Sequence, residues 1–495
     1  MGKHGRLIGK GILFIAILFT VIQLAYRVIV PKFFYQDIWG TSATFVGFYQ
    51  MEKDTVDVLF FGSSLSATAY IPQELYDSYG IASYNLACEQ QNLVTTYFWL
   101  KEALGYQSPE VVVLDCHLLF PYKTHEPLNS PEVSTRKAFD YMRWSGVKWE
   151  AVKTICELDE NQSKMSYYLP NIRYHNRWKD LNREDFAFWE MREHYERKGY
   201  APLPEACGEG HEPFIASASA EEMEMVPLMK EYLDKITDLC KQEGISLVLT
   251  NVPSVVISVE KYNALQRYAN EHDLLFLDFN EKALAEEIGF CYPTDSADGA
   301  HLNLWGAQKV TDYIGQILTD RYDVAAVSDE QWESTKSYYE DLEKDCALVH
   351  ITDIDEYLTA LKEEVEKDRY SVFLSGQGSY SLYLKEETLS KMRELGLEIT
   401  LQDDPTKESF YCYYAVIADG TVKEYIGYDE LNTNGTIRNG TIPYDITGTG
   451  SIMIEEAETS KRGDGINIVV YHNATKKVLD SVCFHTAEPE NAASR

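Results

Sequence analysis

The sequence is poor in basic residues, and this shortage limits its partners. Its 495 residues include 45 lysines and arginines against 78 aspartates and glutamates, which gives a net charge of -33. Proteins that bind nucleic acids need a basic surface to meet the phosphate backbone. The composition therefore argues against a nucleic-acid partner, and a solvated acidic surface accounts for the charge without any specific partner.

Metal and disulfide patterns are also missing. The cysteines are scattered at positions 88, 116, 156, 207, 240, 291, 346, 412 and 483, and no two of them form a C-x-x-C pair. Structural zinc sites need cysteine or histidine pairs at short spacing. We therefore expect no metal site, no disulfide framework and no cofactor.

Only one apolar run is long enough to cross a membrane. Residues 11–30 are GILFIAILFTVIQLAYRVIV, with Gln23 and Arg27 outside the apolar pattern. Twenty helical residues measure about 30 Å, the thickness of a bilayer core. A cleaved signal peptide is the alternative. The length of the run and the lack of an A-x-A site after it favour an uncleaved anchor.

The charges beside this run predict its orientation. Lys3, Arg6 and Lys10 precede the run, so the positive-inside rule places residues 1–10 in the cytoplasm. The aromatic residues between 33 and 39 are of the kind that lie at the headgroup level. We expect a single-pass protein of the cell membrane whose bulk is extracellular.

Alternating strand and helix patterns follow the anchor, and we assign residues 31–325 to one domain. The strand patterns span 56–61, 81–85, 110–115, 246–250 and 274–278, and the helical patterns span 91–104, 221–242, 258–272 and 302–322. Apolar, β-branched runs of this kind are typical of parallel strands buried on both faces. The order predicts a three-layer α/β fold with a parallel sheet.

An insertion at 120–220 interrupts that alternation. It leaves the third strand at the carboxyl edge of the sheet, where ligands bind in open α/β sheets. The insertion is rich in aromatic residues, and His175, Arg177 and Trp178 are candidates for substrate contact. Two interpretations stay open, namely a cap over a substrate and a small helical subdomain that packs its own aromatic residues.

Two serines directly follow the first predicted strand, in the stretch DVLFFGSSLSATAY at 57–70. Gly62 ends the strand, and a helix is expected just after Ser63 and Ser64 because serine favours helix N-termini. A serine at such a turn is exposed at the sheet edge near backbone N–H groups, which suits a nucleophile. The alternative is that Ser64 only caps the helix.

A second polar cluster, DSADGAH at 295–301, precedes the last predicted helix. Acyl transfer by a serine needs an imidazole to take the hydroxyl proton and a carboxylate to orient that imidazole. His301 and Asp298, three residues apart, can supply both groups from one turn. Because this loop follows the last strand and Ser64 follows the first, both are expected at the same sheet edge.

FGSSLS at 61–66 and DGAHLN at 298–303 resemble motifs of the SGNH/GDSL hydrolase superfamily. The likeness is nearest to its membrane-anchored DltD-like and alginate O-acetylation branch, and it extends over about residues 50–325. The resemblance implies an SGNH-type three-layer sheet. It also implies a Gram-positive bacterial source.

The resemblance implies acyl-ester chemistry through an acyl-Ser64 intermediate, with His301 as base and Asp298 orienting it. We expect O-acylation, in the first place O-acetylation, of a cell-surface polysaccharide. A carbohydrate esterase or deacetylase would use the same triad, and an inactive glycan-binding surface protein is a third interpretation. Related systems include a multi-spanning membrane-bound O-acyltransferase, so such a protein is expected as the acyl donor.

Two stretches depart from the family pattern, and both concern the oxyanion hole. The sequence NLACEQQ at 85–91 lacks the usual glycine, and DCHL at 115–118 stands where the family has G-x-N-D. A backbone N–H survives either replacement. The oxyanion candidates are Ser64, Ala87, Cys88, Gln90, Gln91 and Asn92.

Residues 326–350 are predicted to be a polar helical linker, and residues 351–488 a separate α+β domain. The expected elements of this domain are helices at 353–364 and 385–395, strands at 371–375, 411–417, 451–455, 466–471 and 478–484, and turns over 432–450.

GINIVVY at 465–471 and VLDSVCFHT at 478–486 resemble the interleukin-like EMT inducer (ILEI) domain, with the helices placed before these strands. The resemblance implies a carbohydrate-binding accessory domain, which would raise the effective concentration of polymer at the enzyme. A spacer or dimerisation domain is the alternative.

Overall fold

The computed structural model describes residues 3–32, 41–122, 127–186, 195–208, 210–217, 221–398, 412–427 and 431–495. The chain divides into two compact units, Met1–Asp341 and Leu342–Arg495. The aromatic residues predicted at the headgroup level, between 33 and 39, lie outside the described residues.

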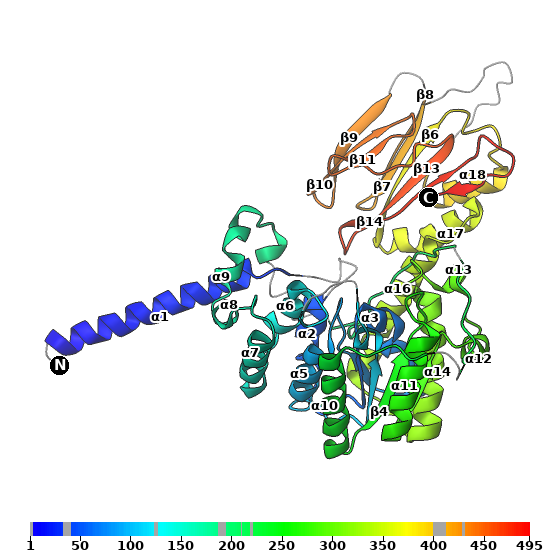
Figure 1. Ribbon diagram of the computed structural model, residues 1–495. Helices are drawn as coiled ribbons and strands as arrows, with labels where there is room; N and C mark the ends of the chain where they lie inside the picture. The colour runs from blue at the N-terminus through cyan, green and yellow to red at the C-terminus, as the bar shows by residue number, and fades with distance from the viewer. Residues whose placement is uncertain are drawn as a thin grey trace. The chain divides into compact units, whose positions relative to one another are not determined.

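Unit 1 combines a parallel sheet with helices on both faces (Figure 1). Its strands are β1 (Val58–Phe61), β2 (Ser83–Asn85), β3 (Val111–Asp115), β4 (Ser246–Asn251) and β5 (Leu275–Asp278). Its main helices are α1 (Lys3–Ile29), α2 (Thr41–Phe48), α3 (Ser64–Ala69), α4 (Pro72–Tyr79), α5 (Leu93–Ala103), α10 (Pro227–Glu243), α11 (Val259–His272), α12 (Lys282–Glu287), α13 (Tyr292–Asp295) and α14 (Leu304–Tyr322).

The five strands are all parallel and follow the order β2-β1-β3-β4-β5. Every residue of β1 and β3 is buried, as expected for strands covered on both faces. The predicted parallel α/β sheet is therefore confirmed. The strand order reverses between β1 and β3, and a crevice opens at such a switch point because the loops leaving the two strands diverge.

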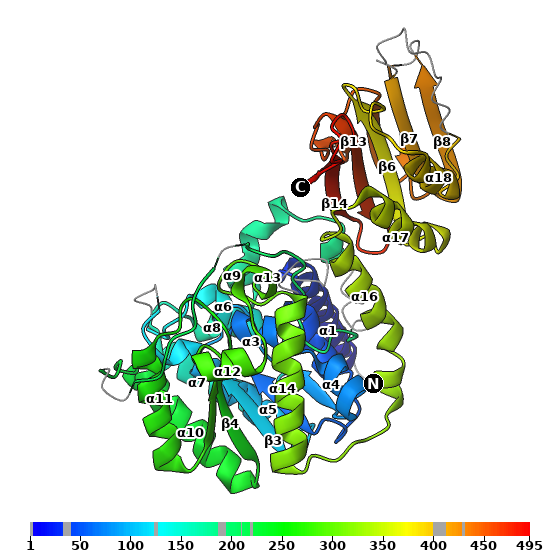
Figure 2. The ribbon, with the colours of Figure 1, turned by 90° about the vertical axis from the view of Figure 1, so that its right-hand side faces the viewer.

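Two helical layers enclose the sheet (Figure 2). On one face, Val112 and Leu114 share a core with residues of α5, α10 and α11. On the other face, Phe60 stacks on Tyr70 at 4.4 Å between ring centroids, and α14 packs against α3 and α4. This arrangement brings α14, which begins just after the D-x-x-H loop, beside the helix that carries Ser64.

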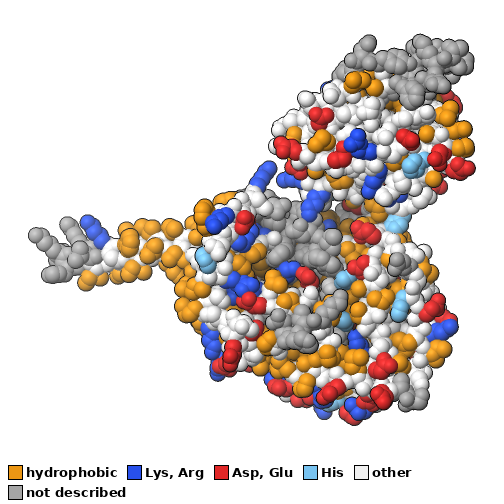
Figure 3. All heavy atoms as spheres, turned by 45° about the horizontal axis from the view of Figure 1, so that its top comes forward, with side chains coloured by type: hydrophobic (Ala, Val, Ile, Leu, Met, Phe, Trp, Pro, Cys, Tyr) orange, Lys and Arg blue, Asp and Glu red, His pale blue; other side chains and the backbone are white. Residues whose placement is uncertain are grey.

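Helix α1 contains the apolar run. Its segment Ile8–Ile29 is long and apolar enough to cross a membrane, a property that signal sequences share. Most of its side chains are exposed (Figure 3), whereas Tyr26 is buried against the rest of unit 1. The C-terminal end of α1 contacts the insertion at α9 (Asn171–Tyr174) and at the 3-10 turns η2 (His175–Lys179) and η3 (Glu184–Phe186).

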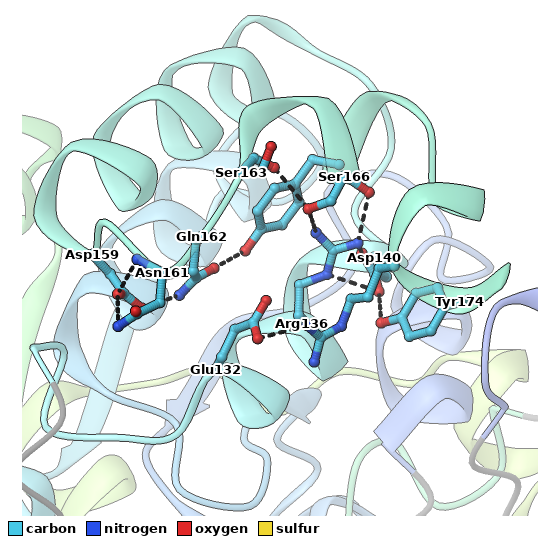
Figure 4. A network of polar contacts seen from close by, with 11 residues as sticks. Glu132, Arg136, Asp140, Asp159, Asn161, Gln162, Ser163, Ser166 and Tyr174 are labelled. Atoms are coloured by element: carbon cyan, nitrogen blue, oxygen red, sulfur yellow. Dashed lines mark hydrogen bonds and ion pairs between the residues drawn. The ribbon is translucent and has the colours of Figure 1, made fainter. Parts of the chain in front are cut away.

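The insertion has its own polar core, built around Arg136 (Figure 4). It contains α6 (Glu132–Asp140), α7 (Gly146–Leu158) and α8 (Lys164–Tyr168), besides α9 and the two turns. Arg136 is 1% exposed, pairs with Asp140 at 2.8 Å, donates to the Ser166 carbonyl at 3.0 Å and lies over the Tyr167 ring. The guanidinium thus ties α6 to α8. The hydrophobic side chains of α6 and α7 belong to the same core as the sheet, so the insertion also packs onto the rest of unit 1. The cap stays a prediction.

The helix predicted over 221–242 begins later than expected. It starts at Pro227, at the first helical position, where a missing backbone N–H costs nothing.

The predicted linker is also partly buried. Trp332, in α15 (Glu330–Glu333), is fully buried and stacks on Tyr76 in unit 1, and α16 (Lys336–Leu348) follows it.

Unit 2 is a layered domain of antiparallel sheets and two main helices. Its helices are α17 (Ile354–Glu366) and α18 (Glu386–Glu394). Its strands are β6 (Tyr370–Gln377), β7 (Cys412–Ala418), β8 (Thr421–Gly427), β9 (Asn432–Ile437), β10 (Ile442–Thr447), β11 (Ile452–Ile454), β12 (Ala457–Glu458), β13 (Gly465–His472), β14 (Lys477–Phe484) and β15 (Ala493–Ser494). A six-stranded sheet of order β15-β14-β13-β6-β7-β8 packs against the helices on one face and against a four-stranded sheet of order β12-β11-β10-β9 on the other. The predicted separate C-terminal region is confirmed.

The prediction of turns over 432–450 is wrong. Strands β9 and β10 form an antiparallel hairpin there. In β10, every second residue (Ile442, Tyr444 and Ile446) points into the core between the two sheets. The many Gly, Thr and Asn residues favour turns, but the alternation of three apolar residues decides the structure.

Gly62 is required by a close approach at the end of β1, and this gives a first prediction. A Cβ atom at this position would lie 2.7 Å from the Ser66 Cβ and 2.8 Å from the Asp115 Cβ, at a φ of +154°. We expect Gly62→Ala to lower the free energy of unfolding of unit 1 by about 2 to 4 kcal/mol. All eight tryptophans lie in unit 1, so denaturation followed by tryptophan fluorescence reports on this unit. Gly146→Ala, which meets open space at the start of α7, is the control and should change stability by less than about 1 kcal/mol. Equal stability of the two variants would contradict the prediction.

Candidate active site

Ser64 is presented by the turn between β1 and α3. The capping role falls on its neighbour, because the Ser63 Oγ accepts a hydrogen bond from the Leu65 N–H at 3.3 Å. Ser64 is the first residue of α3, where backbone N–H groups have no partner within the helix. Ser63 therefore caps α3, and the Ser64 hydroxyl does not.

The D-x-x-H loop folds back on itself. One oxygen of the Asp298 carboxylate accepts from the backbone N–H groups of Ala300 and His301, at 3.0 and 2.8 Å. The other lies 2.8 Å from Nδ1 of the His301 ring. Partial burial acts to raise the pKa of Asp298, but the hydrogen bonds and charge of His301 outweigh it and hold that pKa below its usual value. The carboxylate is thus ionised and orients the ring.

The structure brings Ser64, His301 and Asp298 into one hydrogen-bonded row. The His301 Nε2 lies 2.9 Å from the Ser64 Oγ. When Nδ1–H donates to Asp298, Nε2 carries a lone pair and can accept the hydroxyl proton. This geometry is that of a serine nucleophile with its base and orienting carboxylate.

A strap formed by residues 198–205 holds the two halves of this row together. The Ala201 N–H donates to the Ala67 carbonyl in α3 at 2.8 Å, and the Leu304 N–H donates to the Leu203 carbonyl at 3.1 Å. Asn303, which caps α14, donates its amide to the Glu205 carbonyl at 3.0 Å. The strap therefore connects the serine helix to the helix that follows His301. No motif in the sequence announces it.

A pocket of about 190 Å³ lies beside the row. Its lining includes Ser63, Ser64, Glu89, Gln90, His117 and His301. The loops after β1 and β3 both contribute, so the pocket lies at the switch point of the sheet. Its volume is below the range typical of pockets for drug-sized ligands, which favours a short acyl group over a long chain.

Only two of the oxyanion candidates, Ser64 and Gln90, line this pocket. Ala87 is buried in a small apolar cluster with Ala67 and Ala201, and burial raises the pKa of the Cys88 thiol to about 12. Gln91 donates to the Leu86 carbonyl, and Asn92 caps α5. These last two side chains have structural partners.

The cap candidates do not line the pocket. Arg177 donates to the Ile29 carbonyl at the end of α1 and pairs with Asp185 at 2.8 Å. His175 and Trp178 lie in the exposed turn beside it. This part of the insertion therefore contacts the apolar helix, and the prediction of a substrate cap finds no contact to support it.

His117, directly after β3, is a pocket residue that the sequence analysis did not single out. Its side chain is 7% exposed, and its Nδ1 atom is buried without a hydrogen-bond partner among the described residues. Burial, together with the charges of Lys261 and His301, lowers the pKa of His117 to about 3, so the ring is neutral. A buried N–H without a partner costs more than a bare lone pair, which favours the tautomer with the proton on Nε2. The ring is then a neutral hydrogen-bond donor in the pocket.

Asp115 positions this histidine. Its carboxylate accepts hydrogen bonds from the backbone N–H groups of His117 and Val252, both at 3.3 Å, and burial raises its pKa to about 7.

Among the described residues, no three His, Cys, Asp or Glu side chains are grouped so that they could hold a metal ion.

A scan of the chain against models of known protein families finds no match. A search of curated proteins also finds no relative. The chemistry of the site therefore has to be argued from its geometry.

The buried, neutral His117 predicts a loss of stability in acid. Its ordinary pKa is about 6.5, so below that pH the unfolded chain binds a proton that the folded chain, with a pKa of about 3, does not. Stability present above pH 6.5 is lost as the pH falls toward 3. Between pH 7 and 4.5 we expect the wild type to lose about 2 to 3 kcal/mol more than His117→Phe, followed by tryptophan fluorescence in urea.

His211→Phe, at an exposed histidine, is the control and should lose as much as the wild type. Equal acid losses in the wild type and His117→Phe would show that His117 is charged in the folded chain.

Proposed function

We propose that this chain is a membrane-anchored, extracytoplasmic serine enzyme of the SGNH type that transfers an acyl group, in the first place acetyl, to a cell-surface polysaccharide. The observation that carries the proposal is the row from the Ser64 Oγ through the His301 ring to Asp298, with distances of 2.9 and 2.8 Å. Serine, imidazole and carboxylate in this order are the groups that acyl transfer requires.

The first half-reaction loads the enzyme. His301 Nε2 takes the proton of the Ser64 hydroxyl as the Oγ attacks the carbonyl carbon of the acyl donor. The tetrahedral intermediate collapses when the bond to the leaving group breaks, and that group takes the proton from His301. The product is an ester on Ser64.

The second half-reaction repeats these steps with an acceptor. His301 removes the proton of a sugar hydroxyl, whose oxygen attacks the acyl carbon on Ser64. Collapse of the second intermediate returns the proton to the Ser64 Oγ and leaves the ester on the sugar. The negative oxygen of each intermediate needs donors, and the Ser64 N–H and the neutral His117 ring are the candidates in the pocket.

An esterase is the second candidate, and one observation favours it. A transferase has to favour the sugar hydroxyl over water, so it needs to exclude water from the acyl-enzyme. His175, Arg177 and Trp178, which were expected to cover the substrate, do not line the pocket. With water as acceptor, the same residues would remove acyl groups from the polymer.

The other parts of the chain fit a role at the cell surface. The apolar helix supports a single-pass anchor, with the cytoplasmic N-terminus that Lys3, Arg6 and Lys10 predict. The resemblance of residues 351–488 to the ILEI domain supports a glycan-binding role for unit 2. One helix cannot pass an acyl donor across a membrane, which supports a multi-spanning O-acyltransferase as partner.

Labelling with a fluorophosphonate tests the nucleophile. We expect the full chain in detergent to gain one label by intact mass, because His301 activates the Ser64 hydroxyl. Ser64→Ala and His301→Ala should abolish labelling, and Asp298→Asn should slow it by roughly two to four orders of magnitude. Ser63→Ala is the matched control. It removes the helix cap, at a cost of about 1 kcal/mol, and one hydroxyl of the pocket lining, but it leaves Ser64, His301 and Asp298 in place and should still be labelled.

Two results would contradict the proposal. One is a label that persists in Ser64→Ala. The other is unlabelled wild-type protein that is folded and remains unlabelled with its membrane partner present, which would favour the inactive glycan-binding protein.

Partition of the acyl-enzyme separates the two candidate reactions. With 4-nitrophenyl acetate as donor, a transferase should release nitrophenol faster when an oligosaccharide acceptor is added and should form acetylated sugar. An esterase should release nitrophenol at an unchanged rate and form only acetate. The measurement is the ratio of acetylated sugar to acetate, with Ser64→Ala as the blank.

A further inference from the structure

A cavity lies where the apolar helix meets the insertion. It has a volume of about 650 Å³ and does not include Ser64. One wall is the face of α1 that carries Phe19, Gln23 and Arg27, and the opposite wall belongs to α7 and α8. We call it the interface cavity. Its volume is within the range of pockets for small molecules.

The position of α1 places this cavity at the surface of a membrane. The α1 wall runs from Phe19 to Val30, which is about 16 Å of helix, and most of it belongs to the apolar segment Ile8–Ile29. If that segment lies in a bilayer, the side chains opposite it lie at the outer interface.

The joint between α1 and the insertion is held by polar contacts. Lys32 donates to the carbonyls of Val28 and Val30 at 3.1 and 2.9 Å, and Arg177 donates to the Ile29 carbonyl. Cations at a helix C-terminus satisfy carbonyls that have no partner within the helix. Asp185 binds both cations, at 3.7 and 2.8 Å. These contacts fix the insertion to the outer end of the anchor.

The far wall of the cavity consists of exposed aromatic side chains. Trp144 and Trp149 are 47% and 54% exposed, and both contact the Tyr168 ring, at 5.5 and 4.7 Å between centroids. Large exposed aromatic residues mark interaction surfaces, and tryptophan and tyrosine favour the membrane–water interface. Figure 3 shows hydrophobic and basic side chains together on the surface next to the C-terminal end of α1. On the same insertion, Met165 is 50% exposed and Trp178 is 64% exposed.

The charges around the cavity are basic, although the chain as a whole is acidic. Arg27, Arg143 and Lys148 belong to its lining. Arg143 is exposed and lies 4.3 Å from the Tyr49 ring centroid. Lys148 is buried, and its Nζ donates to the Met142 carbonyl at 2.6 Å beside the Trp144 ring. The carboxylate in the lining, Asp140, is paired with Arg136. Basic residues beside a membrane segment attract anionic lipids.

We propose that the interface cavity binds an anionic phospholipid of the outer leaflet, with an acyl chain between α1 and the tryptophan pair and the headgroup phosphate at the exposed Arg143. The proposal rests on the membrane anchoring in the proposed function but not on its chemistry. A lipid in this place would hold the insertion on the membrane surface and so limit the orientations of the unit that carries Ser64.

Quenching of tryptophan by brominated lipids tests the proposal. The full chain is placed in phosphatidylcholine nanodiscs that contain, at equal mole fraction, either brominated phosphatidylglycerol or brominated phosphatidylcholine. Subtracting the fluorescence emission of the double variant Trp144→Phe/Trp149→Phe from that of the wild type gives the emission of this tryptophan pair alone. We expect brominated phosphatidylglycerol to quench this difference emission more strongly than brominated phosphatidylcholine.

Variants of the basic residues test recognition of the headgroup. We expect Arg143→Gln to weaken the preference for phosphatidylglycerol about fivefold, the effect of about one basic residue near an anionic surface. Lys153→Gln, an exposed residue on α7 outside the lining, is the matched control and should keep the preference. Difference emission that neither lipid quenches, or that both quench equally in the wild type, would overturn the proposal.

Two further measurements keep these outcomes distinct. If the tryptophan double variant fails to fold, native mass spectrometry of the full chain is used, and the proposal requires retained phosphatidylglycerol that Arg143→Gln loses. Fluorophosphonate labelling in the same nanodiscs reports on Ser64 separately. Labelling without quenching overturns the lipid site alone, and quenching without labelling overturns the enzyme alone.

Discussion

The hydrogen bond between Ser64 and His301 joins two segments that lie 237 residues apart in the chain, and the site depends on holding them together. A parallel sheet brings both to one edge, but it does not fix their separation. That is done by close backbone contacts. Gly306 lets α14 approach the turn before it, since a Cβ atom there would lie 2.1 Å from the Asp295 carbonyl oxygen. The strap at 198–205 then connects α3 to α14 by hydrogen bonds that do not depend on side-chain type.

The insertion contacts both the apolar helix and the elements that carry the candidate site. Arg177 donates to the Ile29 carbonyl of α1, and Ala201 in the strap donates to the Ala67 carbonyl in the helix that carries Ser64. Arg136 gives the insertion a buried polar core. A buried arginine without its carboxylate would be very costly, so this core has one favoured arrangement. The insertion therefore contacts both the C-terminal end of α1 and the helix that carries Ser64.

Much of the sheet and of the catalytic row can be predicted from the sequence, because their signals are local. Apolar β-branched runs predict strands, and Asp298 and His301 are neighbours in one turn. The role of His117 is not predictable in this way. Its neutrality comes from burial and from the charges of Lys261 and His301, which are distant in sequence. The cap interpretation stays a prediction, since aromatic content does not show which surface a side chain faces, and His175, Arg177 and Trp178 do not line the pocket.

The acidic charge of the chain is not evenly distributed over the described residues, since basic side chains line the interface cavity. A net charge of -33 disfavours approach to an anionic surface, so a protein held at a membrane by one helix would be pushed away from it. If α1 spans a membrane, the basic side chains around the interface cavity oppose that repulsion beside the helix. The pocket beside Ser64 carries the single carboxylate Glu89 in its lining, and Lys137 pairs with it at 2.5 Å. The carboxylate in this lining is therefore balanced by a cation.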